Sequence, residues 1–505
     1  SFVYKAAAEI GELGDNTAAL RRALSADALL RRALQSPGAR VAILGHTRWA
    51  SVGIISEPNT HPLNSFELEQ SGGVQAPYVV AALNGDVDNH ADLRVAHGLR
   101  IASTITTDAK VIPALVARHA TTTDLAEAFR RTVCEFEGSV AIGVASAQAP
   151  SRLFLALRGS GQGLYIGLAD DCYIVASEPY GVVEETLRYL RMDGEDGGEI
   201  ISVTAATAGE LDGIERYAYD GSSRPIAEDE IVVAEVTTRD IDRGEAPHFL
   251  LKEITESPSS FAKTLRGKIA TEPDGGLRAA VGERALPPAL AEKLADGTIT
   301  RVRVIGQGTA AVAGQSTAAI LGELLDSSFD VDAVTATELS GFQLDLDMSD
   351  TLAIAVSQSG TTTDTHRTVD LIRARGGSVI GIVNRRGSDL ADKAHGVLYT
   401  SDGRDVEMSV ASTKAFYCQV VAGYLLALHM ASLAGVLDEQ RLARRLLRLQ
   451  DAPRCLRVVL EESRERVRLA AQLALRRRHW TVVGSGPLHP AAREIRIKLS
   501  ELCYK

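Results

Sequence analysis

The stretch Leu352-Ala-Ile-Ala-Val-Ser-Gln-Ser-Gly-Thr-Thr-Thr363 joins a short apolar run to a loop rich in hydroxyl side chains. The apolar run predicts a buried strand, and the residues from Asp364 to Arg375 have a helical pattern. The same order occurs earlier, where Val302 to Ile305 is followed by a helical pattern from Ala310 to Leu325. Strands that alternate with helices predict a parallel, doubly wound sheet. The hydroxyl-rich loop therefore belongs to a strand-to-helix junction of an α/β domain.

This loop is chemically suited to a phosphate group. A helix start offers unpaired backbone N–H groups and a positive dipole end, Gly360 permits close approach, and the hydroxyls add donors. The same side chains could merely cap the helix. Gly306-Gln-Gly308 with Ala311 also fits a dinucleotide-binding fingerprint, but no acidic residue closes the second strand at the distance that this fingerprint requires. We therefore expect a sugar phosphate.

The residues up to about Val203 have a different pattern, in which short β-rich runs are separated by turn residues. These runs are Val79 to Leu83, Val140 to Val144, Leu153 to Leu157 and Tyr173 to Ala176. They predict an α+β domain with antiparallel sheets. A helical pattern from Phe249 to Ile269 lies in the linker that follows. Trp480 to Val483, running into Gly484-Ser-Gly486, predicts the first strand of a second α/β domain.

Composition narrows the possible partners. The chain has 505 residues, with 54 basic and 65 acidic side chains, a net charge of -11 and 45% hydrophobic residues. This length predicts several domains, and the negative charge argues against nucleic acid as a partner. No apolar run is long enough to suggest a membrane span. The five cysteines are widely spaced and form no metal-ligand pattern, which favours a reducing, cytoplasmic setting.

The hydroxyl-rich loop, the helix after it and Val410-Ala-Ser-Thr-Lys-Ala-Phe416 resemble the sugar-isomerase (SIS) domains of isomerising glutamine–fructose-6-phosphate aminotransferases. The resemblance implies that the loop binds the phosphate of the sugar. The sugar-phosphate-binding residues that it implies are Thr309, Ser357, Gln358, Ser359, Thr362, Val410 and Ser412.

The last helical pattern, from His489 to Tyr504, resembles the catalytic helix of the same family. Glu494, Lys498 and Glu501 stand at i, i+4 and i+7, which places them on one helix face. A cation there could orient an open-chain sugar while a carboxylate moves a proton between adjacent carbons, and similarity assigns the base role to Glu501. An exposed, salt-bridged helix face is the alternative interpretation.

Three segments of the first half resemble the glutamine-binding segments of class II amidotransferases, which implies an N-terminal-nucleophile fold, an αββα sandwich. They are Gly45 to Gly53, Asn59 to Pro62, and Leu83-Asn-Gly-Asp-Val-Asp-Asn-His90. The implied glutamine-binding residues are Arg48, Trp49, Ser51, His61 and Asp108. Arg48 would pair with the α-carboxylate, Asp108 with the ammonium, and Trp49 would act as a gate. Asn84 and the Gly85 N–H would form the oxyanion hole, although Asn-Gly alone is commonly a plain turn.

The resemblance also implies a domain plan. It predicts a class II glutamine amidotransferase domain over 1–230, a linker with a helical segment over 231–290, a first SIS domain over 291–440 and the start of a second over 450–505. In this family the nucleophile is an N-terminal cysteine. The opening Ser1-Phe-Val-Tyr-Lys5 does not resemble that strand, and the ring-opening histidine and Schiff-base lysine would follow Lys505. We therefore expect a fragment, truncated at both ends and inactive by itself.

The implied reaction uses glutamine and fructose 6-phosphate to make glucosamine 6-phosphate, the entry step of hexosamine synthesis. The implied protein is a cytoplasmic homodimer without metal or organic cofactor. Gln307 and Ala310 stand where the family usually has cysteine and serine. This departure leaves open an aminotransferase or deglycase that acts on another sugar phosphate. A non-catalytic sugar-phosphate sensor is the second alternative.

Overall fold

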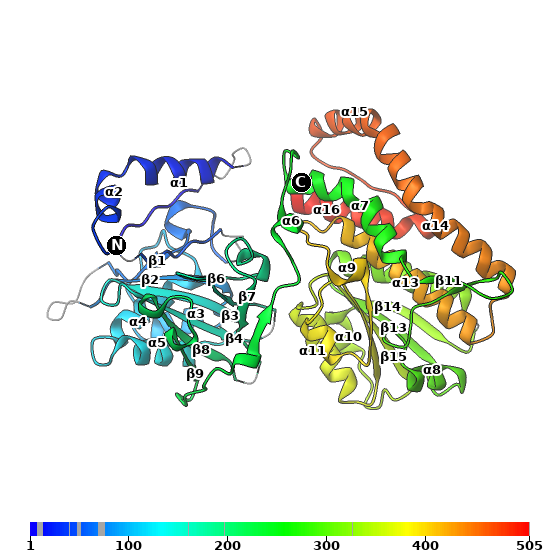
Figure 1. Ribbon diagram of the computed structural model, residues 1–505, viewed down its shortest axis with the longest axis horizontal. Helices are drawn as coiled ribbons and strands as arrows, with labels where there is room; N and C mark the ends of the chain where they lie inside the picture. The colour runs from blue at the N-terminus through cyan, green and yellow to red at the C-terminus, as the bar shows by residue number, and fades with distance from the viewer. Residues whose placement is uncertain are drawn as a thin grey trace. The chain divides into compact units, whose positions relative to one another are not determined.

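The computed structural model describes residues 1–7, 14–39, 41–47, 52–68, 76–159, 161–195, 197–325 and 327–503. The chain divides into two compact units, Ser1–Thr238 and Arg239–Lys505. Figure 1 shows sheets in both units, antiparallel in the first and parallel in the second. Each unit has its own buried core and is described by itself.

The first unit is built on a six-stranded antiparallel sheet in the order β1-β2-β3-β4-β8-β9. Its strands are β1 (Leu63–Asn64), β2 (Val79–Gly85), β3 (Val140–Ser146), β4 (Arg152–Arg158), β8 (Glu199–Thr204) and β9 (Ile214–Ala218). Helices α3 (His90–Ala96), α4 (Val111–His119) and α5 (Leu125–Cys134) belong to this unit, as do α1 (Asp15–Ala26) and α2 (Ala28–Leu34).

A second, four-stranded antiparallel sheet has the order β10-β7-β5-β6. Its strands are β5 (Tyr165–Leu168), β6 (Tyr173–Ala176), β7 (Arg188–Arg191) and β10 (Ile231–Val233). The alternation of side chains along β3 explains the layers, because Val140, Ile142 and Val144 join the core with α4 and α5, whereas Ala141 joins the core between the sheets. The described residues thus form a helix layer and two sheet layers, and all four predicted strand runs are strands.

The second unit contains a five-stranded parallel sheet in the order β14-β13-β15-β16-β17. The strands are β13 (Arg301–Gly306), β14 (Asp330–Thr335), β15 (Thr351–Ser357), β16 (Ser378–Val383) and β17 (Gly396–Tyr399). Helices α7 (Phe249–Leu265), α8 (Pro288–Ala295), α9 (Thr309–Leu324) and α13 (Lys414–Leu433) contribute to the core on one face. Helices α10 (Ala336–Phe342), α11 (Thr363–Arg373) and α12 (Asp389–Lys393) contribute to the core on the other. The predicted doubly wound sheet is confirmed.

The remaining elements of this part of the chain are mostly helical. They are α6 (Thr238–Ile241), the hairpin β11 (Ile269–Thr271) and β12 (Leu277–Ala279), α14 (Glu439–Glu462), α15 (Arg464–Leu475) and α16 (His489–Cys503). The predicted strand from Trp480 to Val483 is wrong, since these residues carry no strand pairing. A strand forms only where a neighbour accepts its backbone hydrogen bonds, and the described residues after α15 contain no second strand. The helical segment of the predicted linker, α7, packs into the core of the second unit through Phe261 and Leu265.

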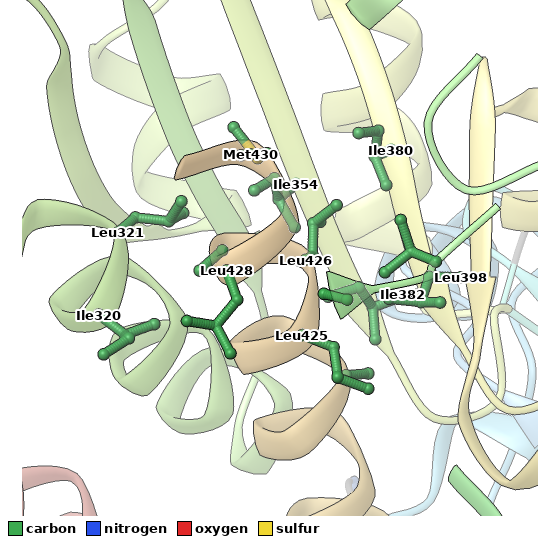
Figure 2. Close-up of a cluster of buried hydrophobic side chains, with 14 of the residues drawn as sticks. Ile320, Leu321, Ile354, Ile380, Ile382, Leu398, Leu425, Leu426, Leu428 and Met430 are labelled. Atoms are coloured by element: carbon green, nitrogen blue, oxygen red, sulfur yellow. The ribbon is translucent and has the colours of Figure 1, made fainter. Parts of the chain in front are cut away.

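Helix α13 is long and apolar enough to cross a membrane, but 61% of its most apolar window is buried inside the structure. Figure 2 shows Leu426 of this helix beside Ile354 of the sheet. Its apolar composition therefore matches that of a core helix covered by its own sheet and by α7 and α9.

Close approach between α9 and α13 depends on one glycine. A Cβ atom at Gly423 would lie 1.9 Å from Oγ1 of Thr317, a distance that no packed pair of atoms can adopt. Thr317 is buried on α9, and its hydroxyl donates to the carbonyl of Ala313 (3.2 Å). The two helices can therefore pack at this separation only with glycine at position 423.

We predict that Gly423→Ala lowers the stability of the second unit by about 1–3 kcal/mol, because the new methyl group overpacks the α9–α13 contact. Gly322→Ala on α9 is the matched control, since a Cβ there has open space around it and alanine favours helix by up to about 1 kcal/mol. Urea unfolding with hydrogen exchange of the β13 and β15 amides measures both variants. Equal destabilisation by the two substitutions would contradict the packing argument.

Candidate functional site

The two loops singled out in the second half of the sequence lie at one edge of the parallel sheet. Strands β13 and β15 are neighbours, and from them the strand order proceeds in opposite directions, to β14 on one side and to β16 on the other. Ligands of open α/β sheets bind outside the carboxyl ends of the strands at such a switch point. The loop after β13 carries Gln307 and Gly308, and the loop after β15 begins at Ser357. A hydrogen bond from Nε2 of Gln307 to Oδ2 of Asp364 (3.2 Å) connects the two loops.

The loop after β15 has the geometry of an anion cradle. Oγ of Ser357 accepts from the Gly360 N–H (3.0 Å), and Oγ of Ser359 accepts from the Thr361 N–H (3.2 Å). Gly360 has φ of 67°, and a Cβ atom there would lie 2.2 Å from Oγ of Ser388. Thr362 precedes α11, and its side chain makes no capping hydrogen bond to that helix. Ser357, Gln358, Ser359 and Thr362 are thus brought together in one loop.

A buried histidine supports this loop from behind. Nε2 of His366 on α11 donates to the carbonyl of Gly360 (2.7 Å), and the His366 side chain is almost wholly buried. The contact fixes the peptide at the centre of the loop. His366 lies outside the hydroxyl-rich motif, on the helix that follows it. Its supporting role is therefore visible only in the folded structure.

The last helix, α16, places its three predicted catalytic side chains beside α9. Nζ of Lys498 lies 2.7 Å from Oε1 of Glu494 and 3.6 Å from Oε2 of Glu501. Oγ1 of Thr309, the first residue of α9, donates to Oε1 of Glu494 (3.0 Å) and accepts from Nζ of Lys498 (2.8 Å). Glu494 is buried, whereas the Glu501 side chain is 40% exposed. The predicted shared face of this helix is confirmed by geometry, and its anchor is Thr309.

Tyr417 on α13 is a further side chain of this region that the sequence reasoning missed. Partial burial, together with the Glu494 carboxylate, raises the pKa of Tyr417. A phenol with a raised pKa stays protonated and able to donate a hydrogen bond at neutral pH. The only signal in the sequence is its place one residue after the motif that ends at Phe416.

The segment around Val410 and Ser412 is shaped by Glu407. Its Oε1 accepts from the N–H groups of Thr413 (2.7 Å) and Ala415 (3.1 Å), and its Oε2 accepts from Oγ of Ser412 (3.0 Å). Val410 is 73% exposed. In the described part of the chain, no hydrogen bond of Ser412 reaches the loop after β15; its hydroxyl donates to Glu407 instead.

Lys414, next to this segment, is a structural anchor. It is buried, and its Nζ donates to Oε2 of Glu256 on α7 (2.7 Å). Burial lowers the pKa of Lys414, but the carboxylates of Asp405 and Glu256 outweigh this effect and raise the pKa overall. The lysine therefore remains charged and holds the start of α13 to α7.

We predict that Thr309→Val loosens α16, because the variant loses the hydroxyl that bridges Glu494 and Lys498. Hydrogen bonds to charged groups contribute about 1.5–3 kcal/mol, so exchange of the α16 amides should become about 10-fold faster or more. Thr309→Ser keeps the hydroxyl and should keep the wild-type exchange rates. Hydrogen–deuterium exchange measures all three proteins, and identical rates for the Val and Ser variants would contradict the bridge.

The first unit contains a cavity of about 1090 Å³, and several predicted glutamine-site residues line it. Asn84 and Gly85 reach it from the end of β2, Asp108 from the start of a short helix, and His61 from the loop before β1. The cavity continues between the sheets, where Leu155 and Val175 line opposite sides. The fold thus brings together four residues from three separate parts of the sequence.

Two of these residues are held by backbone contacts. Oδ2 of Asp108 accepts from the Val87 N–H (2.8 Å), and the Asp108 side chain is buried. Gly85 has φ of 110°, and a Cβ atom there would lie 2.1 Å from the Ser139 carbonyl. Only glycine fits this position, where β2 passes close to the loop before β3. Because Val87 stands two residues after Gly85, its hydrogen bond to Asp108 fixes the buried carboxylate relative to the glycine.

Asn59 organises the approach to this cavity, a role that the sequence reasoning missed. Its Oδ1 accepts from the N–H groups of Thr106 (2.8 Å) and Thr107 (3.1 Å), and its Nδ2 donates to the Ile54 carbonyl (3.2 Å). The side chain is fully buried. His61, two residues later, accepts from the Leu83 N–H at Nδ1 (3.3 Å) and its ring lies 4.4 Å from that of His46. Arg48, Trp49 and Ser51, the remaining predicted residues, lie outside the described part of the chain.

We predict that Asn59→Ala destabilises the first unit by about 1–3 kcal/mol, because the buried Thr107 N–H loses its acceptor and such a loss costs about 1–3 kcal/mol. Thr60→Ala is the adjacent control, since the Thr60 hydroxyl donates only to the nearby Glu57 carbonyl (2.7 Å). Hydrogen exchange of the β2 and β3 amides under increasing urea reads the first unit alone. A cost for Asn59→Ala no larger than that for Thr60→Ala would refute the organising role.

Comparison with known proteins agrees with this geometry. A family model described as "SIS domain" matches residues 299–429, the part that contains β13 to α13. The fold and this match define residues 299–429 as a sugar-isomerase domain with a parallel sheet. Among solved structures, the C-terminal domain of glucosamine-fructose-6-phosphate aminotransferase from Francisella tularensis is 24% identical, with a TM-score of 0.46, and the match covers 52% of this chain and 69% of that one.

Curated relatives extend the match to both units. The isomerising glutamine–fructose-6-phosphate aminotransferase of Pyrobaculum aerophilum is 32% identical over 476 residues, which is 91% of this chain and 69% of the relative. The enzyme of the same name from Gloeobacter violaceus is 30% identical over 469 residues, 91% of this chain and 70% of its own. The chain belongs to the family of isomerising glutamine–fructose-6-phosphate aminotransferases.

Proposed function

We propose that this chain acts in the glutamine-dependent amination of fructose 6-phosphate and the isomerisation of the product to glucosamine 6-phosphate. The observation that carries the proposal is the position of Lys498, which Thr309 holds near the carboxyl end of β13, and of Glu501, whose Oε2 lies 3.6 Å from Nζ of Lys498. Phosphate loop here means Ser357 to Thr362. A proton-transfer pair and an anion cradle at one sheet edge suit a reaction in which a phosphorylated sugar changes its carbonyl position.

In the sugar site, each group has a separate task. The N–H groups and hydroxyls of the phosphate loop bind the phosphate and so fix one end of the open sugar chain. The carboxylate of Glu501 takes the proton from one carbon and returns it to the neighbouring carbon. The ammonium of Lys498, 3.6 Å from Glu501, stabilises the negative charge that develops on the sugar oxygen between these steps.

In the glutamine site, the cavity of the first unit would hold the amino acid. The buried carboxylate of Asp108 pairs with the glutamine ammonium, and Arg48 pairs with its α-carboxylate. Asn84 and the Gly85 N–H stabilise the oxyanion that forms when the amide is attacked. Trp49 and Ser51 complete the site, and Trp49 gates the release of ammonia, which must be kept from water until it reaches the sugar.

The proposal includes an N-terminal-nucleophile fold for the first unit, with an αββα sandwich over 1–230. A linker over 231–290, a first SIS domain over 291–440 and the start of a second over 450–505 complete the domain plan. A cytoplasmic homodimer is the proposed assembly, in keeping with the reduced cysteines, none of which forms a disulfide in the described part of the chain.

One observation favours the alternative that the acceptor is a sugar phosphate other than fructose 6-phosphate. Gln307 reaches across the switch point to Asp364, so an amide occupies space at the edge of the phosphate loop. An aminotransferase or deglycase for another sugar phosphate would use this amide to select its substrate. A sensor without chemistry would need the phosphate loop but neither Lys498 nor Glu501.

The test follows glutamate and hexosamine 6-phosphate together, with the complete gene product, glutamine and fructose 6-phosphate. Equal amounts of the two products support the proposed reaction. Glutamate without hexosamine 6-phosphate rejects fructose 6-phosphate as the acceptor, and a panel of sugar phosphates then identifies the substitute. Sugar-phosphate binding with neither product points to the sensor.

We predict that two substitutions separate binding from chemistry. Ser359→Ala should raise KM for the sugar phosphate about 10-fold with a smaller change in kcat, because a hydrogen bond to a charged group contributes about 1.5–3 kcal/mol. Glu501→Gln should lower kcat by about 100-fold or more with KM nearly unchanged, because the amide cannot accept the proton. Ser340→Ala on α10, whose hydroxyl donates within its own helix, is the control. Steady-state kinetics measure KM and kcat for all three variants. If Glu501→Gln changed KM but left kcat unchanged, the base role would be contradicted.

A further inference from the structure

The loop that follows β17 lies beside the phosphate loop, and one buried amide connects the two. This loop runs from Thr400 to Thr413 and leads into α13; it is here called the β17–α13 loop. The N–H of Asn384, which directly follows β16, donates to the Gln358 carbonyl (3.2 Å), and Nδ2 of the same residue donates to the Asp405 carbonyl. Its Oδ1 accepts from the Thr400 hydroxyl (3.3 Å). Asn384 is buried and therefore sets how the β17–α13 loop lies against the phosphate loop.

The other end of the β17–α13 loop leads to the side chains of α16. Tyr417 stands in the first turn of α13, three residues after Lys414. Burial raises the pKa of Tyr417, and the nearby Glu494 carboxylate raises it further. The chain from Asp405 to Tyr417 thus connects the neighbourhood of the phosphate loop with that of Glu494. A phosphorylated sugar held between these two places would lie along this segment.

A carboxylate of α7 holds the middle of the β17–α13 loop. Oε1 of Glu253 accepts from the N–H groups of Met408 (2.5 Å) and Ser409 (3.1 Å), and its Oε2 accepts from the Ser409 hydroxyl. The Glu253 side chain is buried. Hydrogen bonds to a carboxylate are stronger than those between neutral groups, and a low-dielectric interior strengthens them further. Glu253 therefore fixes two successive peptide groups of the loop.

Glu253 and Glu407 fix the two ends of the stretch from Val410 to Ser412. Glu253 holds the two peptide groups before it, and Glu407 accepts from the N–H groups of Thr413 and Ala415 after it. Among the described residues, none accepts a hydrogen bond from the backbone N–H groups of this stretch. Its place is therefore set from both ends by carboxylates that stand outside it.

The same helix also holds the start of the β17–α13 loop. Glu253 and Thr264 stand at i and i+11, which places them along one side of α7. Ser401 has φ of 46°, a backbone conformation that non-glycine residues seldom adopt. Its N–H donates to Oγ1 of Thr264 (2.9 Å), and its hydroxyl donates to the Ser260 carbonyl (3.1 Å). Helix α7 thus acts as a template for the loop, and Glu253 makes the contact that directly precedes Val410.

We propose that Glu253 is a positioning residue of the sugar site, which holds the backbone from Val410 to Ser412 in contact with the sugar part of the bound sugar phosphate. The inference rests on the proposed function and assigns a residue to it. Glu253 itself touches no substrate and acts through Met408 and Ser409. The phosphate loop has separate supports, because His366 and the loop's own serine side chains hold it. Loss of Glu253 should therefore weaken the binding of the sugar part and leave the binding of phosphate nearly unchanged.

The test compares two probes on the whole chain, fructose 6-phosphate and inorganic phosphate, by isothermal titration. Wild-type protein should bind fructose 6-phosphate more tightly than inorganic phosphate. Glu253→Ala should weaken the affinity for fructose 6-phosphate about 10-fold, the loss expected for one or two hydrogen bonds, and should change the affinity for inorganic phosphate by less than about 2-fold. Glu253→Gln retains an oxygen that can accept from both N–H groups, so it should restore most of the wild-type affinity.

Hydrogen–deuterium exchange measures whether the loop loses its support. The amides from Met408 to Thr413 should exchange faster in Glu253→Ala than in wild type or Glu253→Gln, while those of β15 keep the wild-type rate. Thr255→Ala is the matched control on the same helix, because the exposed Thr255 donates its hydroxyl to the Lys252 carbonyl (2.7 Å), one turn earlier in α7. This variant should match wild type in binding and in exchange.

Two results would overturn the inference alone. One is an affinity of Glu253→Ala for fructose 6-phosphate that equals that of wild type, and the other is an equal loss of affinity for both probes, which would indicate general damage to the second unit. A wild-type chain that binds fructose 6-phosphate no more tightly than inorganic phosphate would instead reject the proposed sugar site, and the inference with it.

Discussion

The close contact between α9 and α13 is the constraint on which the sugar site depends. Gly423 has no side chain, and this lets Thr317 and the rest of α9 lie against α13 and the sheet. With α9 fixed in this way, its first residue, Thr309, stands at the carboxyl end of β13. Thr309 in turn holds Glu494 and Lys498 of α16. A packing requirement in the core thus decides where Glu494 and Lys498 are found.

The sequence predicts best those elements whose burial is uniform. Strand β15 is buried along its whole length, so its apolar run is visible without knowledge of its neighbours. Strand β14 contains the exposed residues Asp330 and Asp332, so it has no continuous apolar run and was not predicted from the sequence. The prediction for Trp480 to Val483 has the opposite error, a strand predicted where none forms. An apolar run becomes a strand only when it pairs with a neighbouring strand. The periodicity of α16 predicts that Glu494, Lys498 and Glu501 share a face, but periodicity within one helix does not reveal that Thr309 anchors this face.

Sequence patterns could not predict the contacts between loops that are far apart in the chain. Asn59 belongs to a segment that resembles a glutamine-binding motif, yet its partners, Thr106 and Thr107, stand 47 and 48 residues later. The contacts of Glu135 are similar, because its two hydrogen-bonded partners, His97 and His119, stand 38 and 16 residues earlier in the chain. Such sites arise only when the fold brings the ends of separate helices and loops together.

The bond between Thr309 and Glu494 joins residues that are 185 positions apart, and this separation has a meaning for synthesis on the ribosome. At about 5–20 residues per second, Glu494 is made about 10 to 40 s after Thr309. All five strands of the parallel sheet precede Glu494 in the chain, as does the loop after β15. A nascent chain therefore has the proposed phosphate loop well before it has α16 with Glu494, Lys498 and Glu501. The proposed ligand-binding part of the site is made first, and the proposed proton-transfer part is made last.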